Sequence, residues 1–172
     1  MAASTTPNSA PLTGDVEVTG PVTATLWAAP SAADTDFTLA LVDVHPDGRA
    51  LLLTDGICRA RFRDAAAGWR PADLHAGRPP YERLYEEPDF RPRLLTPGQP
   101  VELRADMWAT SNLFRKGHRI RIEVSSSNFP RYDRNLNTGG RIGFESAFQV
   151  AEQTLFHDRT RPSRVTLPVI PR

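Results

Sequence analysis

The chain has 172 residues and nearly balanced charge, with 21 lysines and arginines against 20 aspartates and glutamates. This balance argues against a broad nucleic-acid-binding surface, and no apolar run approaches the roughly 18 residues that span a bilayer. The 16 prolines and the single cysteine argue against a helical bundle and a disulfide framework, and favour one globular domain of short strands.

Residues 1–14 are small and polar, and they lack the basic and apolar regions of a signal peptide. We therefore expect a flexible lead-in over residues 1–14 and a domain over residues 15–172. The same observations predict a soluble, cytoplasmic chain with no nucleic-acid or membrane partner.

The first predicted strands follow from alternating polarity. Residues 16–28 alternate apolar and polar side chains, interrupted by a predicted turn at Gly20-Pro21. Residues 37–44 are apolar on both faces apart from Asp43, which predicts a strand buried on both sides. A tight turn at 45–48 should lead into the returning strand.

That returning strand is expected over residues 49–54, and Asp55-Gly56 predicts a second turn. Residues 57–63 then alternate cleanly and predict another strand. It would place Arg59, Arg61 and Arg63 on one face. We favour a solvated face paired with acidic residues of the adjacent strand, the alternative being a contact surface for an acidic partner domain.

Cys58, within the same predicted strand, is interpreted as a small buried hydrophobic residue. The following stretch, residues 64–100, is rich in proline and shows no clear periodicity. A connection of this length is uncommon, so we expect an insertion that packs on something through aromatic residues. Its candidate aromatic contacts are Trp69, Tyr81, Tyr85 and Phe90.

Alternation resumes at residues 101–107, followed by a predicted turn at 113–117 and the clearest strand of the chain at 119–124. Residues 144–156 predict a bulged strand or a short helix, and residues 163–170 an edge strand bounded by prolines. About eight short strands at this spacing predict an all-β sandwich, most simply a jelly roll.

Motifs for catalysis or metal binding are missing from the sequence, which has no nucleophile elbow, phosphate-binding loop or histidine-rich zinc motif. His118 with the serines at 125–127 is the obvious pair for nucleophilic catalysis, but a polar strand end before a serine-rich turn is the better interpretation. His157 and Asp158 would point to opposite faces of a strand. We predict no catalytic, cofactor-binding or metal-binding residue.

The most informative segment is residues 125–140, whose serine, asparagine and aspartate side chains can bond their own backbone and order a loop. An ordered structural loop is preferred, and a loop that meets a ligand or a neighbouring domain is the alternative. The candidate interface residues are Ser127, Asn128, Phe129, Tyr132, Asp133, Asn135 and Asn137.

Several motifs in order resemble the C-terminal domain of the X-Pro dipeptidyl-peptidase and cocaine esterase-like (CocE/NonD) serine hydrolases. They include residues 34–37 (DTDF), 41–50 (LVDVHPDGRA), 117–120 (GHRI) and 125–139 (SSSNFPRYDRNLNTG). The resemblance continues to the C-terminus and implies a galactose-binding-like jelly roll that follows an α/β-hydrolase domain and a helical cap.

In that family the catalytic serine, histidine and aspartate belong to the hydrolase domain, and none of them maps onto this sequence. Two departures are that the hydrolase and cap domains are missing, and that the proline-rich stretch at 68–93 is longer than the family's usual connection.

The resemblance therefore implies a non-catalytic domain that supports an α/β-hydrolase domain and its active-site cleft, with that domain in cis as in the family or in trans. The alternative is a free-standing jelly-roll module that binds carbohydrate or another ligand. Assembly with a second copy of the chain is left open.

Overall fold

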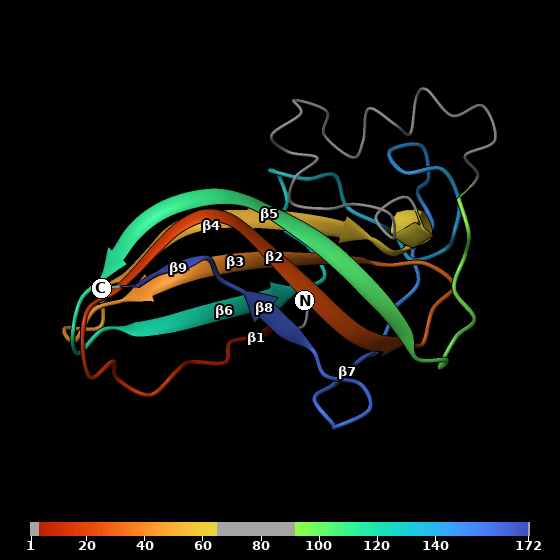
Figure 1. Cartoon of the computed structure of the whole chain (residues 1–172). Coiled ribbons are helices and arrows are strands. Elements are labelled where there is room, and N and C mark those ends of the chain that lie inside the picture. The colour runs from red at the N-terminus through yellow and green to blue at the C-terminus, as the bar shows by residue number, and fades with distance from the viewer. Residues whose placement is uncertain (1–3, 65–91, 172) are drawn as a thin grey trace.

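Two antiparallel β-sheets face each other in the computed structural model, which describes residues 4–64 and 92–171 (Figure 1). The first sheet has the order β1-β6-β3-β4, formed by Ser4–Thr5, Arg119–Ser125, Asp36–Val44 and Ala50–Arg59. The 3-10 helix η1 (Ala60–Phe62) follows β4.

The second sheet is built around β2 (Val16–Pro30), which pairs along one edge with β5 (Val101–Phe114). Its other edge pairs with three short C-terminal strands. They are β7 (Gln153–Phe156), β8 (Arg164–Thr166) and β9 (Val169–Ile170). The sequence therefore correctly predicted an all-β sandwich, and the galactose-binding-like type stays a prediction.

The core lies between the sheets and is made by the alternating residues on their inner faces. Its largest fully buried hydrophobic side chains come from β2, β3 and β5. They are Val18, Val22, Phe37, Leu39, Leu41, Leu103, Met107 and Phe114. Strand β3 is buried along nearly its whole length, as its apolar run predicted, and Cys58 is a buried free thiol.

Two predicted turns are instead parts of continuous strands. Gly20-Pro21 lies within β2, at a register shift between Pro21 and Thr23 against β5. Asp55-Gly56 lies within β4, opposite Leu39 and Ala40 of β3. A glycine in a strand can mark a bulge or a close approach of backbones as well as a turn.

Gly56 marks a close approach. A Cβ atom at this position would lie 2.1 Å from the carbonyl oxygen of Asp106 in β5. Beside it, the hydroxyl of Thr54 donates a hydrogen bond to the carbonyl of Met107. The two sheets therefore come together here, and only a glycine leaves enough room.

The described part of the lead-in follows the edge of the first sheet, where a flexible segment was expected. Thr5 is paired with Val124, and the backbone N–H groups of Ser9 and Leu12 donate to the carbonyls of Ile120 and His118. This pairing covers the backbone groups of β6 that would otherwise form an open sheet edge.

The C-terminal half differs from expectation in extent. Only Gln153–Phe156 of the predicted strand at 144–156 is a strand, and the predicted last strand is divided at Pro168 into β8 and β9. The predicted aromatic contacts of the insertion, at Trp69, Tyr81, Tyr85 and Phe90, lie outside the described residues. Within the described ranges, no helix has the length and apolarity needed to cross a membrane.

Candidate functional site

The loop between β6 and β7, residues 126–152, folds over the end of the first sheet where β3 begins and β4 ends (Figure 1). It is attached there by side chains that reach acidic residues of the sheet. Arg131 pairs with Asp55 of β4, with Nη2 of the arginine 2.7 Å from Oδ1 of the aspartate. The predicted interface loop is therefore fastened to the sandwich at a defined place.

Beneath the loop lies a group of buried charges, which we call the acidic end of β3 and define by Asp34 and Asp36. Both side chains are almost completely buried. Arg61 donates to Oδ2 of Asp34 from Nε at 2.8 Å and from Nη2 at 2.5 Å, and Nη1 of Arg59 lies 2.7 Å from Oδ2 of Asp36. Each buried carboxylate therefore has its own guanidinium.

These contacts correct the prediction of a solvated arginine stripe. Arg59 pairs with Asp36 of the adjacent strand β3, as predicted, but Arg61 is buried, belongs to η1 and pairs with Asp34, which precedes β3. Arg63 donates to the backbone carbonyls of Ala60, Arg93 and Leu94. The chain turns into a 3-10 helix after Arg59, so the three side chains do not share one strand face.

Asn135 joins the loop to the acidic end. Its Nδ2 donates to Oδ2 of Asp34 at 2.7 Å and to Oδ1 of Asp36 at 2.8 Å, while its Oδ1 accepts from the backbone N–H of Asn137 at 2.9 Å. Hydrogen bonds to ionised groups are roughly twice as strong as neutral ones. One amide therefore holds two buried carboxylates and fixes the loop backbone that follows.

Asp36 is perturbed by this environment. Burial raises the pKa of its carboxyl to about 6, against the opposing effects of the Arg59 guanidinium and the Asn135 amide. Desolvation disfavours the charged form of a carboxyl, so the partners only partly compensate for the loss of water.

The other predicted interface residues divide into ordered and exposed groups. Asn137 adopts a positive φ of 65° and donates from Nδ2 to the carbonyl of Gln149 at 2.8 Å. Ser127 is held by Ser125, and the backbone N–H of Tyr132 donates to the carbonyl of Asn128. Asn128 and Asp133 are exposed to solvent.

Four apolar side chains of the same loop are exposed to solvent. Phe129 is 57% exposed, Phe144 72%, Phe148 73% and Val150 78%. Arginines cover two of the rings, Arg134 over Phe129 and Arg141 over Phe144. Phe129 was singled out from the sequence, whereas the other three were assigned to a strand. The sequence feature that could have indicated exposure of these three residues is that they are apolar residues in a stretch without a regular period.

The candidate catalytic pair of His118 and Ser125 is not brought together. His118 precedes β6 and Ser125 ends it, so a seven-residue strand separates them by about 20 Å. Nδ1 of His118 instead lies 2.8 Å from Oδ1 of Asp43. Asp158 accepts hydrogen bonds from Thr160 and Arg161.

Comparison with known proteins identifies the origin of this loop and sheet arrangement. Residues 2–166 match the family described as the X-Pro dipeptidyl-peptidase C-terminal non-catalytic domain. The chain belongs to this family. It is 44% identical over 163 residues to the cocaine esterase of Rhodococcus sp. (strain MB1 Bresler), a match that covers 94% of this chain and 24% of that protein.

Solved structures agree in fold. An α-amino acid ester hydrolase is 27% identical with a TM-score of 0.78, and the match covers 97% of this chain and 25% of that one. An aminopeptidase from the marine sediment archaeon Thaumarchaeota archaeon is 26% identical with a TM-score of 0.79, and the match covers 98% and 26%. The chain thus spans about a quarter of the length of the cocaine esterase, of the α-amino acid ester hydrolase and of the aminopeptidase.

Proposed function

We propose that this chain is the non-catalytic support domain of a serine-type hydrolase acting on ester or amide bonds, and that it docks on an α/β-hydrolase domain through the loop at residues 126–152. The observation that carries the proposal is the exposure of Phe129, Phe144, Phe148 and Val150 in a loop fastened to buried charges. Exposed apolar side chains gathered in one loop favour a contact with another protein surface.

The substrate class comes from the relatives. The names cocaine esterase, α-amino acid ester hydrolase and aminopeptidase all describe cleavage of an acyl bond, to an alcohol or to an amine. In such enzymes a nucleophile, a base and an orienting acid act together. The support domain contributes a rigid surface beside the cleft, and the candidate pair His118 and Ser125 lies at opposite ends of β6.

The acidic end explains why such a loop can serve as a docking surface. Ordering a loop at the moment of binding reduces affinity, whereas a loop already held in place binds with less loss of entropy. Asn135 and Arg131 hold the backbone of this loop on Asp34, Asp36 and Asp55 before any partner arrives.

A complementation experiment tests the proposal. The Rhodococcus cocaine esterase would be shortened by the quarter that matches this chain, and the chain would be supplied as a fusion or as a separate protein. We expect binding, a higher melting temperature and recovered hydrolysis of a p-nitrophenyl ester. The matched control carries Phe144→Ser, Phe148→Ser and Val150→Ser, three exposed positions whose replacement should weaken docking and leave the fold of the chain intact.

Two outcomes would contradict the proposal. One is that the unmodified chain does not bind the shortened esterase and behaves in the assay like the triple-serine control. The other is ester hydrolysis by the chain alone that a serine-directed inhibitor blocks and that Ser127→Ala or His118→Ala removes. Binding of glycans by the free chain would support the alternative of a free-standing module.

We carry two finer expectations into this proposal, a cytoplasmic location and a hydrolase domain supplied in cis or in trans. The free thiol of Cys58, the sole cysteine of the chain, is compatible with a reducing compartment. Cell fractionation and the mass of the purified complex test these two points, and the same mass measurement would reveal a homo-oligomer.

A further inference from the structure

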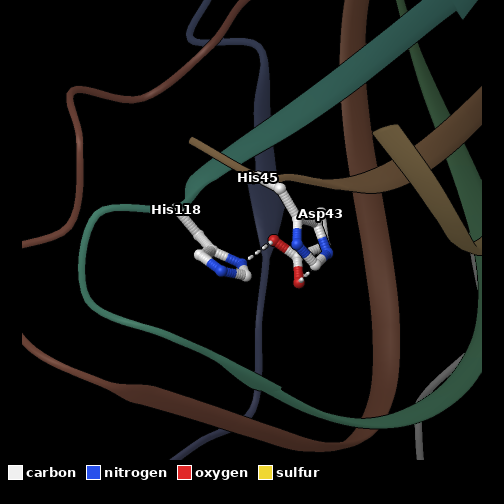
Figure 2. Close-up of side chains that lie close together, drawn as sticks. All are labelled: Asp43, His45 and His118. Carbon is white, nitrogen blue, oxygen red and sulfur yellow. Dashed lines mark hydrogen bonds and ion pairs between the residues drawn. The ribbon is translucent and has the colours of Figure 1, made fainter. Parts of the chain in front are cut away.

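A second cluster of chemically versatile side chains lies at the other end of β3, and we call it the histidine end. It is defined by Asp43 near the end of β3, His45 in the following hairpin, and His118 in the turn before β6 (Figure 2). Their side chains are 6%, 19% and 12% exposed. The resemblance and the proposed docking loop leave all three without a role.

The three side chains converge from separate segments. Nδ1 of His118 is 2.8 Å from Oδ1 of Asp43, and Nε2 of His45 is 3.9 Å from Oδ2 of the same carboxylate. The two imidazole rings lie side by side, with centroids 4.2 Å apart and an interplanar angle of 40°. One potential ligand atom from each residue lies within 4.8 Å of the other two.

Nε2 of His45 is the unusual atom in this cluster. It is buried, and it has no hydrogen-bond partner among the described residues. Buried polar atoms are normally paired, so an unpaired one calls for a ligand or a bound water. Figure 2 shows the Asp43 carboxylate next to both imidazole rings, with a dashed line from His118 to one of its oxygens.

We propose that Asp43, His45 and His118 bind a divalent transition-metal ion of the zinc class. Two imidazole nitrogens and one carboxylate oxygen are a donor set that suits zinc, whereas magnesium and calcium prefer oxygen ligands alone. In a tetrahedral site with zinc bonds of about 2.0–2.2 Å, two ligand atoms lie about 3.4 Å apart, so the side chains need to close by up to about 1.4 Å. The partial exposure of both histidines leaves a fourth position for water.

The backbone around the site is already shaped by two turns. In the hairpin, His45 and Arg49 are joined by a backbone hydrogen bond of 2.8 Å. In the other turn, the N–H of His118 donates to the carbonyl of Arg115, and Gly117 adopts a φ of 85°. A Cβ on Gly117 would lie 3.6 Å from Cγ of Pro46, so the two turns pack against each other. The metal would join two loops whose positions the fold has already set.

One neighbouring cation opposes binding. Nη2 of Arg49 lies 3.5 Å from Nδ1 of His45, which makes that nitrogen the acceptor and leaves the proton on Nε2. Ligation through Nε2 moves the proton to Nδ1, so the guanidinium has to withdraw. Arg49 is exposed, and its Nε lies 2.7 Å from Oδ2 of Asp47. This ion pair can still hold the guanidinium after it has moved away from His45.

The test uses the full chain, stripped with EDTA and dialysed. Titration with ZnCl2 is followed by calorimetry, and titration with CoCl2 by the visible absorption of the bound ion. We expect one equivalent of zinc to bind and to raise the melting temperature, with no effect of MgCl2. His45→Gln should weaken binding at least about tenfold, because it removes one of the three ligands. This variant keeps the Asp43–His118 hydrogen bond and should fold.

Two variants serve as controls with different expected directions. His157→Gln changes an exposed histidine outside the cluster and should leave zinc binding unchanged. Arg49→Gln removes the opposing cation and should tighten binding several-fold. The proposal is overturned if the unmodified chain binds no zinc at about 100 µM, or if His45→Gln and His157→Gln bind zinc equally. Unchanged or weaker binding by Arg49→Gln would contradict ligation through Nε2 of His45.

Discussion

The two ends of β3 use buried aspartates in different ways. At the acidic end, Asp34 and Asp36 each face an arginine and share the amide of Asn135. At the histidine end, Asp43 faces two imidazoles, of which only His118 is within hydrogen-bonding distance. Guanidinium groups stay charged at all relevant pH values, whereas imidazoles can be neutral and can bind metals. The first end is therefore suited to holding a loop, and the second to accepting a ligand.

The largest expected effect tests the ionic character of the acidic end. Arg61→Met leaves Asp34 buried without its guanidinium, which should lower the free energy of unfolding by about 3–5 kcal/mol. Urea denaturation measures this loss. The double variant with Asp34→Asn should recover part of it, since no uncompensated charge then remains. A loss below about 1 kcal/mol in the single variant would show that the pair is not structurally important.

The second prediction concerns pH. Asp36 has a pKa of about 6 in the folded chain and an ordinary value of 3.8, so the folded state holds its proton more tightly. The resulting stabilisation is complete below about pH 4 and is lost as the pH rises through 6. Relative to the unmodified chain, Asp36→Asn should therefore gain up to about 3 kcal/mol in unfolding free energy between pH 4 and pH 7.

Urea denaturation of both proteins across this pH range measures the difference. Taking the difference between the two proteins removes the contributions of other titrating groups that they share. A difference that stays constant with pH would mean that Asp36 titrates near its ordinary value, and that its partners compensate fully for burial.

The third prediction separates the loop from the sheet. Asn135→Ala removes the amide that bonds both buried aspartates, and we expect a loss of about 2 kcal/mol in unfolding free energy. Hydrogen exchange should become faster in residues 126–152 and stay slow in β3. Asn128→Ala, at an exposed position of the same loop, should change stability by less than about 0.5 kcal/mol. Equal effects of the two variants would contradict the attachment through Asn135.

The fourth prediction moves to the histidine end. His118→Gln, measured in EDTA, weakens one hydrogen bond to a buried carboxylate and should cost about 1 kcal/mol in unfolding free energy. This is less than the loss expected for Arg61→Met, because Asp43 keeps His45 nearby and no permanent cation is removed. If His118→Gln were as costly as Arg61→Met, the two ends would not differ in the way described.

The smallest effect concerns an exposed pair beside the histidine end. Arg49→Ala removes an ion pair with Asp47 in which both side chains are more than half exposed. Such pairs contribute little, so we expect a change below about 0.5 kcal/mol in EDTA. Thermal denaturation at low and high salt would check that the change stays small. A larger loss would indicate that Arg49 stabilises the hairpin through its contact with His45.

Local patterns in the sequence were sufficient to predict the sandwich, because polarity that alternates with a period of two is visible within a few residues. Strands β3 and β6 follow from such patterns, as does the pairing of Arg59 with an acidic residue of the neighbouring strand. The prediction of a turn at Gly56 was wrong. A glycine needed for the close approach of a distant backbone looks the same in sequence as a glycine needed for a turn.

The two ends of β3 were not predictable, because their contacts join residues far apart in the chain. Asn135 and Asp34 are 101 positions apart, and His118 and Asp43 are 75 apart. No local periodicity records such a pairing. The loop was singled out by its composition. Which of its asparagines would bond to the sheet depended on the order of the strands, and that order cannot be predicted from the pattern of each strand alone.

The central place of β2 in its sheet also bears on how the chain is made. All of its partners come later, β5 beginning at Val101 and β7 at Gln153. At about 5–20 residues per second, a ribosome needs roughly 4–14 s to add the approximately 70 residues between β2 and β5. During that interval a long strand with one apolar face has both edges open. We expect newly made chains to need protection by chaperones in this interval, and slower translation before β5 to increase aggregation.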